Sequence, residues 1–349
     1  MTDSTHVRAN VRNDLYETIT VTEEPSAYVK RLNEQAVKDG LLEADYEDHL
    51  SKKEKEVKQN KTDPESGFMY RPGKPMGFHY LSHQTCDSEY GIITDVYVTP
   101  GNVTDCTVHS ERIQHQIDLY QFDTEAVCAD SGYDTSEIHH DMLERGIKTY
   151  IPEARTAKDD DHFTVDDFQY DESTDTLTCP NGARLKYSSY LPKVGCKQYR
   201  ASRKDCDDCP YRDKCLSEKA TYKRVTRTYY KKDMDTQHEN NKTQAYKDAM
   251  RLRQIWCEGN FSHQKAHHNL ARVRMRGLSK ASEHCLLSAC ALNLKRMVKL
   301  LGQDTRKVAA QAVAVFTDII MADHLIRMLR MRASGLLFGW FVNSAKMTL

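Results

Sequence analysis

Three acidic residues, far apart in the chain, lie in contexts that suit chemistry with divalent metal ions. Asp3 lies in a short β-rich run, Asp130 ends an apolar run typical of a buried strand, and Glu258 lies in a stretch with helical periodicity. An acid at the end of an apolar strand is costly to bury without a partner. Mg²⁺ binds carboxylates and phosphate oxygens, and two such ions can assist both the attacking and the leaving oxygen of a phosphodiester. The alternative is a purely structural role for each acid.

Four cysteines form a second group with metal-ligand spacing. They follow the pattern C-x26-C-x2-C-x5-C and are Cys179, Cys206, Cys209 and Cys215. Four thiolates hold Zn²⁺ in structural sites, which stabilise segments too small to fold unaided. The spacing therefore predicts a structural zinc knuckle, with Cys196 as a substitute ligand, and the competing interpretation is a set of free thiols. The other six of the eleven cysteines are expected to be small buried apolar residues.

Positive charge gathers around Glu258. The whole chain carries 50 Lys and Arg against 51 Asp and Glu. Residues 251–300, however, hold ten basic residues and only two acids. Arg272, Arg274 and Arg276 lie in this region, and such side chains neutralise DNA phosphates, which gives affinity but little sequence information. A solvated basic face is the alternative.

The elements that would position these residues follow an α/β order. A short strand near the N-terminus precedes two strands joined by a polar turn, and a helix, a strand, a helix and a strand follow. Asp134 or Thr135 is expected to cap the second helix, and His139 and His140 on that helix are expected at the surface. The expected strands span residues 77–83, 91–98, 125–130 and 148–152, and the expected helices span 104–120 and 135–145.

The length of 349 residues is more than one ordinary domain needs. With 39% hydrophobic residues, no run long enough to span a bilayer and no apolar signal segment, we expect a cytoplasmic protein without a membrane partner. Six segments are expected. They are a first catalytic strand (1–20), a charged helical insertion (21–70), a catalytic core (71–153), a cysteine-containing insertion with the zinc knuckle (154–242), helices carrying Glu258 (243–301) and a helical tail (302–349).

The residues around the three acids resemble the motifs of the DDE transposases of bacterial insertion sequences. Five pieces occur in the family's order between residues 1 and 301. They are Asp3-Ser4-Thr5, the strand Gly77–His83, the segment Val98–Asp105, the run Ala129–Asp134, and Glu258 followed by Phe261 and Lys265. Farther along, Arg276-Gly277-Leu278 and Asn293–Arg296 also look like the family.

This resemblance implies a ribonuclease-H-like mixed sheet flanked by helices, with a cysteine-rich insertion before the last catalytic helix. It implies a transposase, active as a homodimer, that cuts DNA at transposon ends and joins the freed 3′-hydroxyl to target DNA. Asp3, Asp130 and Glu258 would bind two Mg²⁺ or Mn²⁺ ions. Arg253 and Lys265 would contact DNA phosphate near them.

Two features depart from the family pattern. The Tyr-x-x-Arg-x-x-x-Glu signature would place its arginine at position 254, where this chain has Gln254, so Arg253 is one residue off. The chain also begins two residues before Asp3, which suggests a truncated copy. Asp63 is an alternative first acid. Two rival functions stay open: a zinc-stabilised DNA-binding protein with relic acids, and a ribonuclease-H-like nuclease that does not join strands.

Overall fold

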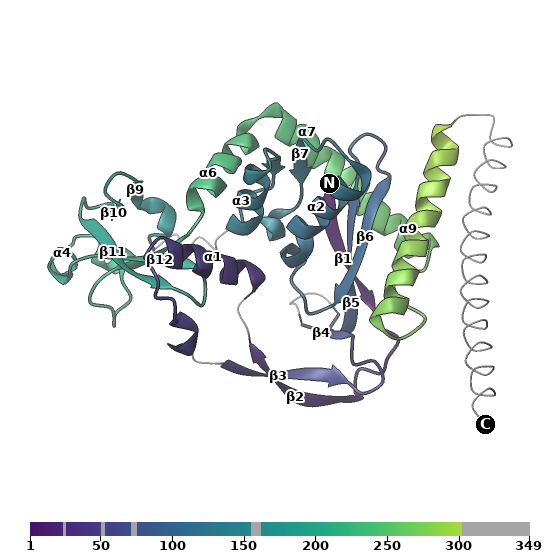
Figure 1. Cartoon of the computed structure of the whole chain (residues 1–349), viewed down its shortest axis with the longest axis horizontal. Coiled ribbons are helices and arrows are strands. Elements are labelled where there is room, and N and C mark those ends of the chain that lie inside the picture. Colours follow the sequence, from purple (N-terminus) through teal and green to yellow (C-terminus); the bar gives the residue numbers. More distant parts are fainter. Residues whose placement is uncertain (24–25, 50–52, 71–74, 155–161, 302–349) are drawn as a thin grey trace, which may run out of the picture. The chain divides into compact units, whose positions relative to one another are not determined.

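A buried strand, β5 (Gly77–Cys86), organises the main sheet. It runs antiparallel to β1 (Thr2–Arg8) and β6 (Ile93–Pro100), while β4 (Gly67–Met69) pairs with its first residues (Figure 1). The predicted pair of strands around the polar turn is confirmed, and Asp3 lies opposite Gln84 in the register. The structure is a computed structural model that describes residues 1–23, 26–49, 53–70, 75–154 and 162–301.

A β-α-β unit follows the antiparallel strands. The parallel strands β7 (Ala126–Cys128) and β8 (Lys148–Tyr150) are connected by α3 (Ser136–Glu144), and they form a two-stranded sheet of their own. Before them comes α2 (His109–Tyr120), which begins with a 3₁₀ turn. Thr135 caps α3, because its hydroxyl accepts a hydrogen bond from the backbone N–H of Ile138. The predicted α/β order is confirmed, and the chain has a mixed α/β fold.

Residues 16–60 differ from the predicted helical insertion. Only α1 (Ala27–Lys38) and the short 3₁₀ turn Tyr46–His49 are helical among the residues described there. The flanking segments β2 (Tyr16–Glu23) and β3 (Lys53–Asn60) form an antiparallel ribbon. The β-branched residues of β2 explain this, because threonine, isoleucine and valine favour strands. The expected first catalytic strand, 1–20, is accordingly split between β1 and β2.

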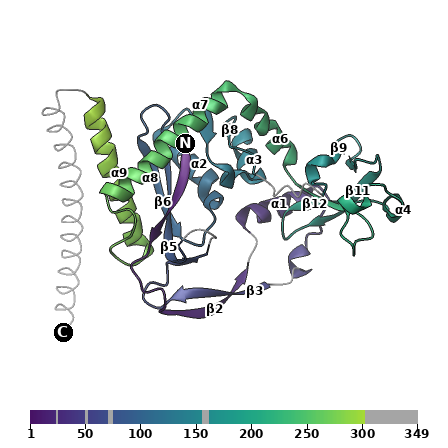
Figure 2. The ribbon, with the colours of Figure 1, turned by 180° about the vertical axis from the view of Figure 1, so that it is seen from behind.

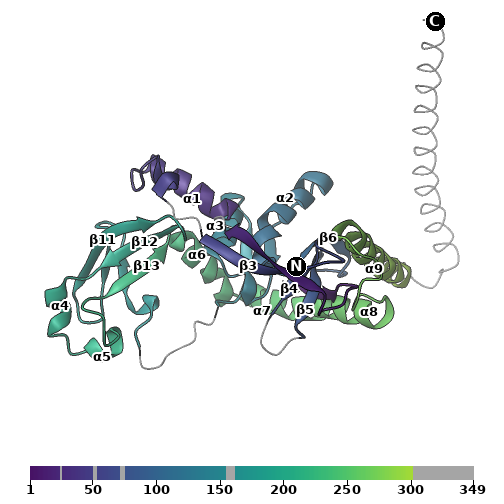
Figure 3. The same ribbon diagram turned by 90° about the horizontal axis from the view of Figure 1, so that it is seen from below.

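The cysteine-containing segment forms a sheet. Its five strands are all antiparallel and pair in sequence order, and the last three of them are labelled in Figure 3. The short helices α4 (Arg203–Asp207) and α5 (Arg212–Cys215) lie between the last two strands in sequence. Phe168, Leu177, Leu185, Tyr199 and Val225 contribute to a core of its own. The strands are β9 (Gln169–Asp171), β10 (Thr176–Thr178), β11 (Arg184–Leu191), β12 (Cys196–Arg200) and β13 (Arg224–Thr228).

Helices carry the rest of the described chain. Helical structure resumes at α6 (Lys231–His238), earlier than the predicted residue 243, and continues through α7 (Gln244–Arg253), a π turn, α8 (Gly259–His267) and α9 (Leu278–Leu300) (Figure 2). The chain divides into two compact units, Met1–Ser288 and Ala289–Leu349. In the described part of the chain no helix combines the length and apolar character needed to cross a membrane. The predicted helical tail, 302–349, lies outside the described residues.

Candidate active site

Arg253 joins two of the three predicted acids. Its guanidinium donates to Asp3 Oδ2 at 3.1 Å and to Glu258 Oε1 at 3.4 Å. The side chains of Arg253 and Asp3 are largely buried, at 11% and 15% exposure, while Glu258 is 52% exposed. Arg253 therefore links β1, through Asp3, to the turn that carries Glu258, two positions that the sequence indicated.

A π turn compensates for the one-residue offset of Arg253. In an α-helix, residues four apart share a face, whereas a π turn adds one residue to the turn. The segment Gln254–Glu258 is π-helical, so Arg253 and Glu258, five residues apart, point to the same side. Such turns occur frequently at functional sites. The offset from the family signature was the one sequence signal of this local structure.

Asp130 and Asp3 line the same cleft, which has a volume of about 530 Å³. Asp130 lies two residues after the end of β7 and caps a 3₁₀ turn, with its Oδ1 accepting from the backbone N–H of Gly132 at 2.8 Å. The glycine matters here, because a Cβ at position 132 would approach Asp130 Oδ1 to 3.0 Å. Asp105 and Lys265 line this cleft as well. Asp105 is thus a further acid at the site, one that the sequence did not single out as catalytic.

The acids of the cleft raise the cost of negative charge there. Burial raises the pKa of Asp3 to about 6; the Ser4 N–H and Arg253 oppose this rise, and the carboxylates of Asp130 and Glu258 add to it. A carboxylate that is costly to ionise beside two others is a place where a cation is favourable. The guanidinium of Arg253 already stands between Asp3 and Glu258 as such a cation. Three oxygen donors of this kind fit Mg²⁺ or Mn²⁺, although the structure does not bring all three within 4.8 Å of one another.

The predicted basic residues lie beside β1. Lys265 Nζ donates to Thr5 Oγ1 at 2.6 Å. Asn10, just after β1, binds the basic loop through three contacts: Arg272 donates to its side chain, Arg276 donates to its carbonyl, and its own amide donates to the Arg274 carbonyl. Backbone hydrogen bonds from residue 8 to residues 271 and 273 fix the same loop. The side chains of the three arginines are exposed.

Asp63, the alternative first acid, lies away from the cleft and holds neighbouring segments together through hydrogen bonds. Its side chain is buried and accepts hydrogen bonds from the Tyr80 hydroxyl at 2.8 Å and from the Gly277 N–H at 3.2 Å. Glu65 similarly accepts from the N–H of Leu278, the first residue of α9. Carboxylates at a helix N-terminus satisfy its free N–H groups. Asp63 does not line the cleft of Asp3 and Asp130.

The four predicted zinc ligands gather in the cysteine-containing sheet. Burial raises the pKa of the Cys215 thiol; Lys223 lowers it, and the nearby thiols of Cys206, Cys209 and Cys179 raise it further. All cysteines are free thiols. In the described chain no three of these sulfurs lie within 4.8 Å of one another. Cys196, at the first position of β12, is not among the thiols that act on Cys215. Of the other six cysteines, Cys86, Cys128, Cys257 and Cys285 are buried, while Cys106 and Cys290 are partly exposed.

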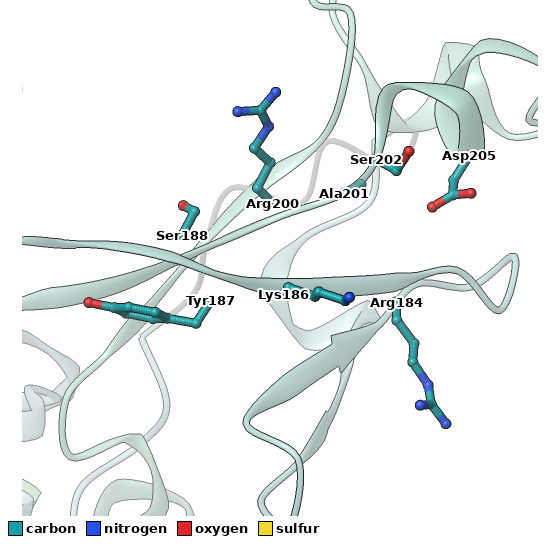
Figure 4. Close-up of a pocket in the computed structure, with 8 residues that line it drawn as sticks. All are labelled: Arg184, Lys186, Tyr187, Ser188, Arg200, Ala201, Ser202 and Asp205. Carbon is teal, nitrogen blue, oxygen red and sulfur yellow. The ribbon is translucent and has the colours of Figure 1, made fainter. Parts of the chain in front are cut away.

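A basic row on the same sheet was missed from the sequence. Lys186, Arg200 and Arg224 are direct cross-strand partners on three neighbouring strands, and all three are exposed. The guanidiniums of Arg200 and Arg224 lie 4.0 and 4.9 Å from the centre of the Tyr222 ring. Lys186 and Arg200 line a hollow of about 480 Å³ (Figure 4). Like charges opposite one another destabilise a sheet, so this row favours an anionic partner.

The prediction that His139 lies at the surface is wrong. Its side chain is fully buried and contacts Asp134, as does His238 of α6. His140 is partly buried, stacks on Tyr230 and contacts Asp233. Local sequence patterns could not indicate this arrangement, because His238 lies about one hundred residues beyond Asp134.

Comparison with known proteins finds a family model that matches part of the chain. Residues 178–298 match the family model described as the transposase DDE domain. No curated protein sequence matches the chain. Among solved structures, the piggyBac transposase synaptic complex with hairpin DNA is similar over 71% of this chain and 53% of that chain, with 13% identity. This chain thus spans about half the length of that one, and the TM-score of 0.21 is too low to support a fold assignment. The matched region includes Arg253, Glu258 and Lys265.

Proposed function

We propose that this protein is a DNA transposase of the insertion-sequence type, acting as a homodimer. It cuts DNA at the ends of a mobile element and joins the freed 3′-hydroxyl to target DNA. The observation that carries the proposal is the meeting of Asp3 and Glu258 on Arg253, beside a cleft that Asp130 lines. The family match at residues 178–298 supports it. We also propose that β1, β5, β6, β7 and β8 belong to a ribonuclease-H-like fold.

Each residue at the site has a part in this activity. Asp3, Asp130 and Glu258 would hold two Mg²⁺ or Mn²⁺ ions, which supply activation of the attacking oxygen and charge neutralisation at the phosphate. Arg253 bridges two of these carboxylates and favours the ionised form of Asp3. Lys265, fixed by Thr5 on β1, holds a DNA phosphate at the cleft.

The two basic surfaces would hold DNA. Arg272, Arg274 and Arg276 form the first, close in sequence to the catalytic helix, and the basic row of Lys186, Arg200 and Arg224 forms the second. Removing one phosphate-binding charge should lower the slope of log affinity against log salt by about 0.9. We expect Arg200→Gln to show this decrease, whereas Lys232→Gln should not, because Lys232 is an exposed lysine already paired with Glu172. An unchanged slope for Arg200→Gln would remove the second surface from the proposal.

We propose that Cys179, Cys206, Cys209 and Cys215 bind a structural zinc ion. The four thiols lie around α4 and α5, two helices of five and four residues that are too short to be stable alone. A tetrahedral thiolate site is a common means of holding such a segment. Cys206→Ser should therefore release zinc and loosen this sheet.

The experiment that tests the activity is Mn²⁺-dependent nicking of supercoiled plasmid, with Glu258→Ala beside the unchanged chain. Glu283→Ala is the matched control, because Glu283 is also a half-exposed helical acid, and it pairs with Lys280 in the same turn. We expect nicking to be lost in Glu258→Ala and retained in Glu283→Ala.

Each other outcome supports a rival. Absence of nicking in every protein, with zinc and salt-sensitive DNA binding retained, would favour a zinc-stabilised DNA-binding protein. Nicking without joining of a pre-cut end to target DNA would favour a nuclease. Nicking retained in Glu258→Ala would contradict the assignment of the site itself.

A further inference from the structure

A second group of potential metal ligands begins four residues after Asp130. Asp134 Oδ1 lies 2.8 Å from His139 Nε2 and 2.8 Å from His238 Nε2. In the described part of the chain, this is the group of three such side chains whose ligand atoms all lie within 4.8 Å of one another. The side chains of His139, Asp134 and His238 are 0%, 4% and 12% exposed. The group is therefore converged and screened from water.

We propose that Asp134, His139 and His238 bind one zinc-class divalent cation, separate from the catalytic ions and from the cysteine site. Two imidazole nitrogens and one carboxylate oxygen are a ligand set that Zn²⁺ accepts, and they leave one position of a tetrahedral site open. Because all three ligand atoms already point to a common place, little rearrangement is needed to admit the ion.

Two of the three side chains have the surrounding contacts that metal ligands usually have. A histidine that binds a metal through one ring nitrogen usually has its other nitrogen held by a carboxylate, carbonyl or hydroxyl. His139 Nδ1 meets this requirement, lying 2.8 Å from Thr149 Oγ1, whereas His238 Nδ1 lies 3.9 Å from Glu153 Oε1, too far for a hydrogen bond. The second oxygen of Asp134 accepts from the Ala154 N–H at 2.7 Å. Both rings are thus oriented with Nε2 toward the aspartate.

The ion would position the loop that carries Asp130. Asp134 ends this loop, His139 lies on α3 and His238 lies on α6, the first helix after the cysteine-containing sheet. Gln237, beside His238, exchanges hydrogen bonds with the backbone at Ile147 and Thr149 near β8. A cation at this junction would fix α6 against the β-α-β unit and hold the Asp130 turn in place. It is a positioning site, because no ligand touches the cleft.

The test is the zinc content of the full chain, with X-ray absorption to identify the ligands. The background carries Cys206→Ser, Cys209→Ser and Glu258→Ala, so that the cysteine and catalytic sites are both impaired. In this background we expect one zinc per chain with nitrogen and oxygen ligands only. His238→Gln should abolish it, because glutamine can still donate a hydrogen bond to Asp134 but is a poor zinc ligand. His140→Gln, at a partly buried neighbour outside the group, should retain it.

A zinc content in the background that His238→Gln does not change would overturn the proposal and leave a hydrogen-bonded Asp-His-His network. Absence of nitrogen- and oxygen-bound zinc from the background after reconstitution would overturn it as well. If the cysteine substitutions prevent folding, His238→Gln is made in the intact chain. There the nitrogen and oxygen contribution should disappear from the absorption spectrum while the sulfur contribution stays. None of these readouts depends on nicking, so this site and the proposed activity can fail separately.

Discussion

Two carboxylates near one loop, Asp3 beside Asp130 and Asp134 four residues farther on, have pKa values displaced in opposite directions. Asp130 faces a cleft that it shares with Asp3, whose pKa rises to about 6 chiefly through burial. Burial also acts to raise the pKa of Asp134, but hydrogen bonds from His139, His238 and the Ala154 N–H outweigh it and lower that pKa. Burial alone does not decide the charge state of a carboxylate; the number of donors around it does. We propose that the first group acts on DNA through its bound ions, whereas the second holds the loop in shape.

The largest effect should separate these two aspartates. Asp130→Ala should lower the nicking rate by on the order of 10³-fold or more, as loss of a central catalytic group does, while the free energy of unfolding changes little. Asp134→Ala should lower the free energy of unfolding by about 3–5 kcal/mol, because it leaves two enclosed imidazoles without their acceptor. Nicking assays and urea unfolding of both variants measure this. If both variants lost activity and stability alike, the two groups would be one functional unit.

The sequence predicted the first group much better than the second. Asp130 follows an apolar strand, but local patterns alone were weak, and the resemblance of the surrounding motifs to DDE transposases selected Asp3, Asp130 and Glu258. His238, which contacts Asp134, is 104 residues away from it in the chain, and nothing in the sequence around His238 indicates that it is buried or binds a metal ion. His139 precedes the polar residues His140 and Asp141, which favoured an exposed position for it. Contacts between distant segments are set by tertiary packing, which local periodicity does not describe.

Local structure was predicted where one signal dominated. The strands β5 and β6 and the helices α2 and α3 follow clear apolar periodicity and turn residues. The ribbon of β2 and β3 was missed because β3 alternates lysine and glutamate, and alternating charges are compatible with both an exposed helix and an exposed strand. The π turn before Glu258 was visible only as the one-residue offset of Arg253, since a single inserted residue leaves helical periodicity almost unchanged.

The next effect concerns pH, and it should run in opposite directions at the two groups. Asp3 has a folded pKa of about 6, above its ordinary 3.8, so its ionised form costs stability that appears as pH rises from 3.8 through 6. Asp3→Asn should therefore stabilise the metal-free chain above pH 6, by about 3 kcal/mol at most, and should have no effect below about pH 4. Urea unfolding between about pH 4 and pH 7 tests this. A stabilisation that does not depend on pH would show that the ionisation of Asp3 is not its cause.

Asp134 should show the reverse dependence. Its folded pKa is depressed, so its contribution to stability is present above its unfolded pKa of 3.8 and is lost as pH falls through the folded value. At neutral pH, Asp134→Ala should be less stable than the unchanged chain, and this deficit should shrink on acidification because the unchanged chain loses stability. Asp3→Asn should be more stable than the unchanged chain at neutral pH, and this advantage should shrink on acidification because the unchanged chain gains stability.

A smaller effect should follow from Arg253, the cation already present in the first group. Arg253 lowers the pKa of Asp3 by its charge. Arg253→Gln should raise that pKa further and move the pH midpoint of nicking upward by about one unit. Arg251→Gln, an exposed arginine two residues earlier, should leave the midpoint in place. A midpoint that moves downward would mean that Arg253 chiefly competes with the catalytic ions.

The smallest effect should come from Thr149, the outer partner of His139. Its hydroxyl lies 2.8 Å from His139 Nδ1, and its side chain is buried. Thr149→Val keeps the shape but removes this contact, so the free energy of unfolding should fall by about 1 kcal/mol. Thr226→Val, on an exposed position of β13, is the control and should change it by less than about 0.5 kcal/mol. The nicking rate at saturating Mn²⁺ should stay unchanged, because Asp134 keeps both imidazoles. A loss of nicking that exceeds the loss of stability would show that the orientation of His139 affects the position of Asp130 through the loop. The Asp134 group would then contribute to nicking as well as to stability, and the two groups would differ only in the size of that contribution.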